Sequence, residues 1–174
     1  QSFEPVDYET ADRESLIDFM MNAGIIGLGG AGFPSYVKYK FAKDVKMLII
    51  NAVECEPFIT ADYRTIQENV KEFRTGVLAM RKMAMARKCR LLLKKTHQDL
   101  IDFVNEAFKN DEGVKAVGVP DVYPMGWERV LVRELLHKEY EKLPIEVGAI
   151  VNMQKRQSPL VRHCCMDKQL HIVF

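Results

Sequence analysis

The stretch Gly27-Leu28-Gly29-Gly30-Ala31-Gly32-Phe33-Pro34-Ser35 holds four glycines within six positions. Glycine has no Cβ, so such a backbone can adopt positive φ and approach a ligand closely. Pro34 and Ser35 predict the first turn of a helix, because proline is tolerated at the first helical position. A glycine-rich turn that leads into a helix N-terminus binds phosphate well. The stretch therefore predicts a phosphate site for a nucleotide or a flavin, and a purely structural turn is the alternative.

Gly27, Gly29 and Gly32 also match the G-x-G-x-x-G pattern of dinucleotide-binding folds. In those folds the pattern follows a strand and opens the helix of a βαβ unit. Here the preceding segment, 12–23, predicts a helix because its apolar residues recur at helical spacing. The loop thus lies between two helices, which argues against the standard dinucleotide fold and leaves a different phosphate cradle.

Composition describes a globular chain with no obvious macromolecular partner. The chain has 174 residues, 48% hydrophobic and 28% charged, enough for one domain with a sizeable core. Its net charge of +1 gives no basic footprint for nucleic acid or anionic lipid. Apolar runs such as 47–52 are too short to span a bilayer, and no signal peptide is recognisable. Because the chain starts with Gln1, we expect it to be a fragment of a longer protein.

The four cysteines are Cys55, Cys89, Cys164 and Cys165, and they form no C-x-x-C pair. The four histidines are scattered, so spacing predicts neither a zinc site nor an iron–sulfur site in this chain. We therefore expect a reduced, cytoplasmic protein without a metal of its own.

Strands and helices are predicted to alternate along the chain. Short apolar runs predict strands at 46–53, 89–93, 114–122 and 148–151, and helical periodicity predicts helices at 34–43, 62–85, 99–108 and 128–137. Pro120 breaks the third strand region. Such alternation indicates an α/β fold, with a mainly parallel sheet of about four strands flanked by helices. We predict one domain over 1–174.

Polar and aromatic residues follow the predicted strands. Asn51 and Glu54 end the first strand, Tyr123 and Glu128 follow the third, and Asn152 ends the fourth. Open α/β sheets bind ligands at the carboxyl ends of their strands. This combination suits a flat heteroaromatic ring with polar edges.

Four blocks of the chain together resemble the FMN-binding domain shared by the C subunit of the Rnf electron-transport complex and the 51 kDa flavoprotein of respiratory complex I. The blocks are GLGGAGFPS at 27–35, NAVECEPFITAD at 51–62, YPMGWE at 123–128 and VN at 151–152. The second block is closer to the Rnf type, which includes the electron-transfer protein associated with proline reductase. Cobalamin reductases with the same flavin domain are a near alternative. The resemblance implies a Rossmann-like FMN domain.

The resemblance also implies roles for the matching positions. For FMN it implies a loop around the phosphate with a cation near it, contacts to the ring or ribityl chain, a tyrosine near the ring, and a residue of the fourth strand that borders the flavin. In this order the residues are Gly27, Gly29, Gly30, Gly32, Lys38, Asn51, Glu54, Cys55, Tyr123 and Asn152. For a nicotinamide nucleotide such as NADH it implies stacking on Phe33 and a contact with Glu128. FMN itself would carry the chemistry, taking two electrons as a hydride and passing them on singly.

Two regions depart from the family pattern. Val53 and Trp127 stand where the complex I flavoprotein has acids, so fewer acids are expected at the NADH side. Trp127 is predicted to be a buried core residue, and stacking on a ring is the alternative. The basic segment 153–165 loses the resemblance, which returns at 166–174. A local frameshift would give this pattern, and resequencing the DNA would decide it.

The function expected from the resemblance is electron transfer between a nicotinamide nucleotide and iron–sulfur centres. The 4Fe-4S clusters are expected outside this chain, because family members carry them on cysteine-rich segments further along. Other subunits of an electron-transfer complex are the expected partners, with a cytoplasmic location that reaches the membrane only through them. A docking domain that has lost FMN is the alternative from a different class.

Overall fold

The fold follows from a computed structural model that describes residues 6–26, 32–53 and 66–153. Its elements in chain order are α1 (Arg13–Asn22), α2 (Ser35–Lys40), β1 (Met47–Asn51), α4 (Val70–Ala84), β2 (Lys88–Lys94), α5 (Gln98–Ala107), β3 (Val114–Val119), α6 (Glu128–Leu136), the 3-10 helix η1 (Pro144–Val147) and β4 (Ala149–Met153). Each predicted strand and helix within these residues has a counterpart, with ends that differ by a few residues.

The strands form one sheet in the order β3-β2-β1-β4, and every neighbouring pair is parallel. The predicted α/β fold with a parallel four-stranded sheet is therefore confirmed. Strand β1 lies in the middle, paired with β2 on one side and with β4 on the other. Because all strands run the same way, their carboxyl ends share one edge of the sheet, which we call the carboxyl edge.

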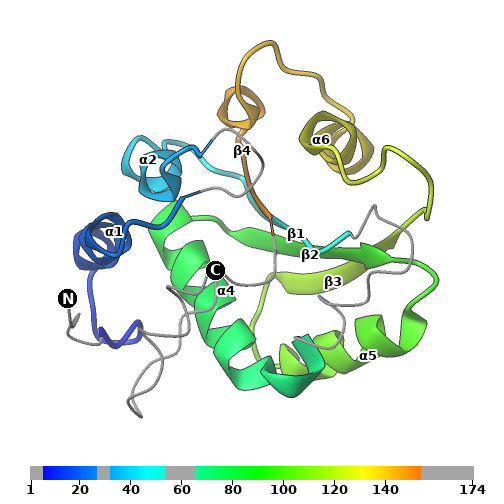
Figure 1. Ribbon diagram of the computed structural model, residues 1–174, viewed down its shortest axis with the longest axis horizontal. Helices are drawn as coiled ribbons and strands as arrows, with labels where there is room; N and C mark the ends of the chain where they lie inside the picture. Colours follow the sequence, from blue (N-terminus) through cyan, green and yellow to red (C-terminus); the bar gives the residue numbers. More distant parts are fainter. Residues whose placement is uncertain (1–5, 27–31, 54–65, 154–174) are drawn as a thin grey trace.

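Helices cover both faces of the sheet (Figure 1). Helices α4 and α5 lie against one face, where Leu48 and Ile50 of β1 point into the larger hydrophobic core. Helix α6 lies against the other face, where Ile49 of β1 joins a smaller core with Leu131 and Val132. Alternate residues of β1 thus face opposite cores, which explains why Leu48, Ile49 and Ile50 are all apolar.

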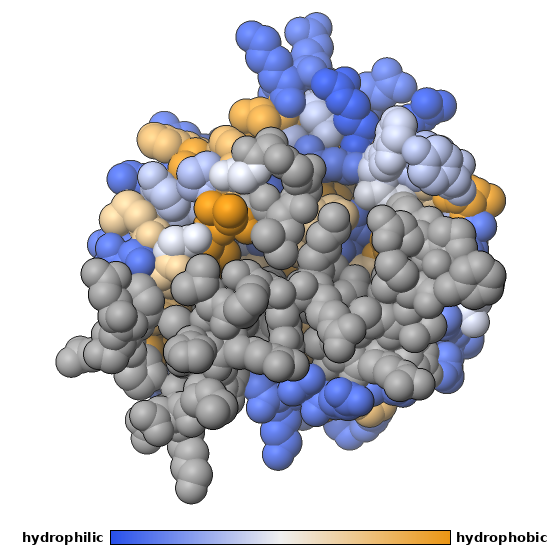
Figure 2. Space-filling model, in the orientation of Figure 1, coloured by the Kyte–Doolittle hydropathy of each residue, from blue (hydrophilic) through white to orange (hydrophobic). Residues whose placement is uncertain are grey.

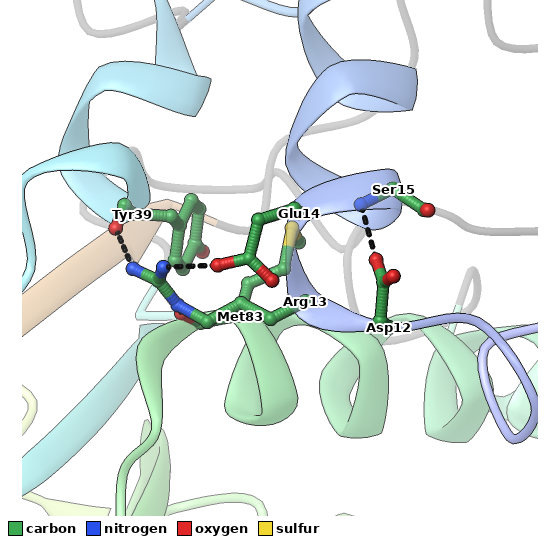
Figure 3. Close-up of polar contacts among 6 residues, drawn as sticks. All are labelled: Asp12, Arg13, Glu14, Ser15, Tyr39 and Met83. Atoms are coloured by element: carbon green, nitrogen blue, oxygen red, sulfur yellow. Dashed lines mark hydrogen bonds and ion pairs between the residues drawn. The ribbon is translucent and has the colours of Figure 1, made fainter.

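Helix α1 begins as its sequence predicts, because the Asp12 carboxylate accepts a hydrogen bond of 2.7 Å from the Ser15 backbone N–H. The Arg13 guanidinium then joins three helices (Figure 3). It donates to the carbonyl oxygen of Met83 at the end of α4 (2.9 Å) and to that of Tyr39 in α2 (2.5 Å). Arg13 therefore fixes α2 relative to the rest of the fold.

Two sequence expectations need correction. The single helix expected over 62–85 is interrupted at Asn69, whose φ of −127° and ψ of 41° are not helical, so α4 starts at Val70. Residues 66–68 form a separate helical turn, and 62–65 lie outside the described residues. The third strand region is expected to continue to Val122 beyond a break at Pro120, but the strand ends at Val119, because Pro120 cannot donate to the strand ladder.

None of the helices in the described part of the chain is both long enough and apolar enough to cross a membrane.

Candidate functional site

The residues on either side of the glycine stretch are hydrogen-bonded to each other. Ile26 and Pro34 form an isolated antiparallel bridge, and the Ser35 N–H donates to the Ile25 carbonyl oxygen at 3.0 Å. Gly32 has φ of +58°, which a residue with a Cβ rarely adopts, so glycine is needed there for its backbone conformation. Gly27, Gly29 and Gly30 lie outside the described residues, as do Glu54 and Cys55. The chain enters α2 directly after this loop, as predicted.

The side chain of Lys38 connects α2 to the sheet. Its Nζ atom donates a hydrogen bond of 2.7 Å to the carbonyl oxygen of Val151 in β4. Burial lowers the pKa of Lys38, and the negative charge of Glu128 partly offsets this effect. An ammonium group has three donors, and the bond to Val151 uses one of them. Lys38 thus brings a positive charge close to the carboxyl edge.

Asn51 closes the end of β1 with its side chain, and only 1% of the residue is exposed. Its Nδ2 atom donates to the carbonyl oxygen of Gly126 at 2.9 Å and lies 2.9 Å from the Met153 sulfur. Its Oδ1 atom accepts from the Val53 N–H at 3.0 Å. These bonds make Asn51 a clamp that ties the turn before α6 to the carboxyl edge. Its direct contact with a flavin stays a prediction.

Asn152 of β4 also uses its side-chain amide to connect separate elements. Its Nδ2 atom donates to the Tyr39 hydroxyl oxygen and lies 2.8 Å from the Met80 sulfur. Tyr39 is completely buried, and this burial raises the pKa of its phenol. Asn152 therefore links β4 to α2 and α4, beneath the residues that lead to the glycine loop.

Glu128 is the first residue of α6, and its carboxylate interacts electrostatically with the ammonium group of Lys38 in α2. The Tyr140 hydroxyl donates a hydrogen bond of 3.0 Å to Glu128 Oε1, and burial together with the Glu128 charge raises the pKa of Tyr140. Helix α6 gains from an acid in its first turn because the helix dipole is positive there. A carboxylate and an ammonium group thus face the same region.

Trp127 is exposed, and the prediction of a buried core residue is wrong. Its exposed fraction is 57%, and that of Tyr123 is 77%. The two rings lie edge to face, with centroids 5.8 Å apart and planes at 75°. The error arises because the α6 positions that enter the core are Leu131 and Val132, whereas Trp127 precedes the helix as its N-cap.

Apolar residues also reach the surface around α2, where Figure 2 shows hydrophobic side chains. Phe33, between the glycine loop and α2, is 41% exposed.

Sequence reasoning located the edge but missed how it is held together. Arg13, Tyr39 and Gly126 received no role, although they hold α2 and the turn before α6 in place. Asn51 and Gly126 are 75 positions apart, so no local pattern could have paired them.

The fold and this edge define an α/β domain of the kind that binds a nucleotide or flavin at the carboxyl ends of its strands. Residues 20–154 match the family described as the Nuo51 FMN-binding domain, and the chain belongs to this family. The resemblance inferred from the four sequence blocks is confirmed.

Curated relatives are components of oxidoreductase complexes. The C subunit of the proton-translocating ferredoxin:NAD(+) oxidoreductase complex of Clostridium ljungdahlii is 35% identical over 142 residues, 79% of this chain and 31% of the relative. The C subunit of the ion-translocating oxidoreductase complex of Yersinia pseudotuberculosis is 37% identical over 134 residues, 76% of this chain and 19% of the relative. The chain thus spans between a fifth and a third of their lengths.

A solved structure of similar fold supports the same assignment. The crystal structure of an NAD+-reducing [NiFe]-hydrogenase in the H2-reduced state contains a chain that is 25% identical, with a TM-score of 0.69. The match covers 82% of this chain and 29% of that one. Family and relatives together support an electron-transfer oxidoreductase module.

Proposed function

We propose that this chain binds FMN at the carboxyl edge and passes electrons between a nicotinamide nucleotide and iron–sulfur centres carried elsewhere. The single observation that carries the proposal is the position of Lys38, because its helix follows the glycine stretch directly and its ammonium group bonds to Val151 in β4. Membership of an FMN-binding family and relatives named as subunits of ferredoxin:NAD(+) oxidoreductases support the same conclusion.

The donor set suits FMN. The phosphate would occupy the glycine loop formed by Gly27, Gly29, Gly30 and Gly32, with Lys38 contributing a charged donor. Asn51, Glu54, Cys55 and Asn152 would line the ring and ribityl chain, with Tyr123 beside the ring. Bound FMN would supply hydride and single-electron chemistry. The protein would supply orientation, since the clamps at Asn51 and Asn152 hold the edge through hydrogen bonds within the protein.

NADH is the proposed electron donor, with Phe33 and Glu128 as its contacts. The 4Fe-4S clusters and the remaining subunits would lie outside this chain, and those subunits would place it at the cytoplasmic face of a membrane. The flavin domain of a cobalamin reductase shares the FMN site, so it differs only in the final electron acceptor.

Titration with FMN, followed by flavin fluorescence and visible absorbance, tests the proposal. Saturable binding is expected in the wild-type chain. Gly30→Asp is expected to abolish it, because the substitution places a carboxylate where the phosphate would lie. Asn110→Asp is the charge control, since it adds one carboxylate at an exposed position outside the loop. Absence of FMN binding in the wild-type chain would contradict the proposal and favour a docking domain that lacks the cofactor.

A further inference from the structure

The exposed pair Tyr123 and Trp127 is not explained by packing or by helix capping. Both rings are mostly open to solvent, although aromatic rings gain most from burial. Trp127 occupies the N-cap of α6, where Ser, Thr, Asp or Asn would accept a hydrogen bond from the helix. Within the described residues the Trp127 side chain makes no such cap. An indole at this position therefore costs stability and calls for another role.

The backbone that carries the two rings is fixed firmly to the carboxyl edge. The Met125 N–H donates to Val122 O at 2.8 Å, and the Trp127 N–H donates to Pro124 O at 2.9 Å. The carbonyl oxygen of Gly126, between these residues, accepts from the buried Asn51 amide. The rings are thus presented on a rigid turn, and a rigid platform loses little entropy when it binds a ligand.

The polar groups beside the rings indicate what kind of ligand they would take. Glu128, the next residue after Trp127, uses Oε1 to accept from Tyr140, and a carboxylate has a second oxygen for a hydroxyl or amide donor. A planar ring that stacks on the indole and carries hydroxyl or amide groups for Glu128 meets both requirements, and a nucleotide has both features.

We propose that Trp127, supported edge-on by Tyr123, is a stacking residue for a planar base of the nicotinamide dinucleotide. This inference rests on the proposed function, because it assigns the outer part of the same site to the dinucleotide. Trp127 acts through binding and takes no part in hydride transfer.

The chain carries its own probe for this proposal, because Trp127 is its one tryptophan. With FMN bound, the intrinsic emission of Trp127 is measured while ADP-ribose or nicotinamide mononucleotide is added. Neither ligand absorbs at the emission wavelength of tryptophan, so a change in emission relative to the FMN-loaded protein reports binding close to the indole. Quenching by ADP-ribose assigns the adenine ring to Trp127, and quenching by nicotinamide mononucleotide assigns the nicotinamide ring. Either result supports the proposal.

Variants then measure the contribution of the ring to affinity. Trp127→Ser is expected to raise the Kd for NAD+ at least about tenfold, since stacking of one base on an aromatic side chain has that effect. Trp127→Phe retains a ring and is expected to change the Kd less than about threefold. FMN affinity is expected to stay unchanged in both. Phe103→Ser, an exposed aromatic residue on α5, is the matched control.

Three results would overturn the proposal while leaving FMN binding intact. The first is nucleotide binding, detected calorimetrically, without any change in Trp127 emission. The second is an unchanged NAD+ affinity in Trp127→Ser, which would assign the exposed rings to a protein partner. The third is FMN binding by the wild-type chain with no binding of either nucleotide. Failure of the wild-type chain to bind FMN would instead count against the proposed function itself.

Discussion

The Nδ2 atom of Asn51 lies 2.9 Å from the carbonyl oxygen of Gly126, and this bond joins the end of the central strand to the turn that carries Trp127. The same side chain accepts from the Val53 N–H, so one amide satisfies a donor and an acceptor of the backbone in a buried position. Asn51 thus attaches the turn before α6 to the carboxyl edge.

Asn51→Leu is therefore expected to destabilise the protein by about 1–3 kcal/mol, because it removes two hydrogen bonds to backbone groups in a buried position. It should also weaken FMN binding, since the turn before α6 loses its attachment. Asn105→Leu is the control: Asn105 makes the same pair of bonds to Ala116, between α5 and β3. Urea unfolding and FMN titration should show similar stability losses in both variants and an affinity loss in Asn51→Leu alone. Equal FMN affinity in the two variants would contradict this role of Asn51.

Lys38→Met is expected to raise the Kd for FMN at least about tenfold, because it removes a charged hydrogen-bond donor from the site. Lys40→Met, on the exposed side of the same helix, should leave the Kd unchanged. Isothermal titration of both variants makes the comparison. A similar Kd in the two variants would show that Lys38 serves the fold and not the ligand.

Glu128→Gln is expected to lower the pKa of Lys38 further, because the charge that partly offsets burial is removed. The pKa can be followed by NMR on the methylated amine of Lys38 in the two proteins. A higher pKa in the variant would contradict the electrostatic link between α2 and α6.

Arg13→Met is expected to cost about 2 kcal/mol of stability, since hydrogen bonds from a charged donor to two carbonyl groups are lost. Glu14→Gln should cost less than about 1 kcal/mol, because the Glu14 side chain is exposed and its ion pair with Arg13 is surrounded by water. Denaturant unfolding of both variants gives the two values. Equal losses would mean that the ties to Tyr39 and Met83 contribute little.

Cys89 is expected to resist thiol reagents in the folded protein. Burial raises the pKa of its thiol to about 12, from a reference value of 9.0. Because the folded pKa lies above the unfolded one, this contribution to stability is complete below about pH 9 and declines as the pH rises from 9 toward 12. With Cys55, Cys164 and Cys165 replaced by serine, Cys89 should react with a disulfide reagent at pH 8 only after denaturant is added. Rapid reaction without denaturant would show that the sheet opens near β2.

The sheet could be predicted from the sequence because its strands are recognisable from local patterns. The buried part of β1 is apolar between the two cores, and Pro120 marks the end of β3. Periodicity also identified the buried face of α4, including Phe73, Val77 and Met80. The interruption of the helix at Asn69 could not be predicted, because the helical spacing of apolar residues continues across it.

The site could be predicted only as far as its residues belong to recognisable blocks. Lys38 was chosen for its nearness to the glycine loop, and its bond to Val151 depends on a contact 113 positions away. The exposure of Trp127 was mispredicted because hydrophobicity alone suggests burial, whereas the position of the indole before the first turn of α6 decides the outcome.

The tie made by Arg13 has a practical consequence for anyone who trims this protein. The family match begins at residue 20, yet Leu16 and Ile17 of α1 are buried in the larger core, and Arg13 bonds to two other helices. The evolutionary boundary of the domain and its physical boundary therefore differ by most of a helix. A fragment cut at residue 20 would lose the hydrogen bond from Arg13 to Tyr39 of α2. The helix that follows the Ile26–Pro34 bridge would then be less firmly held.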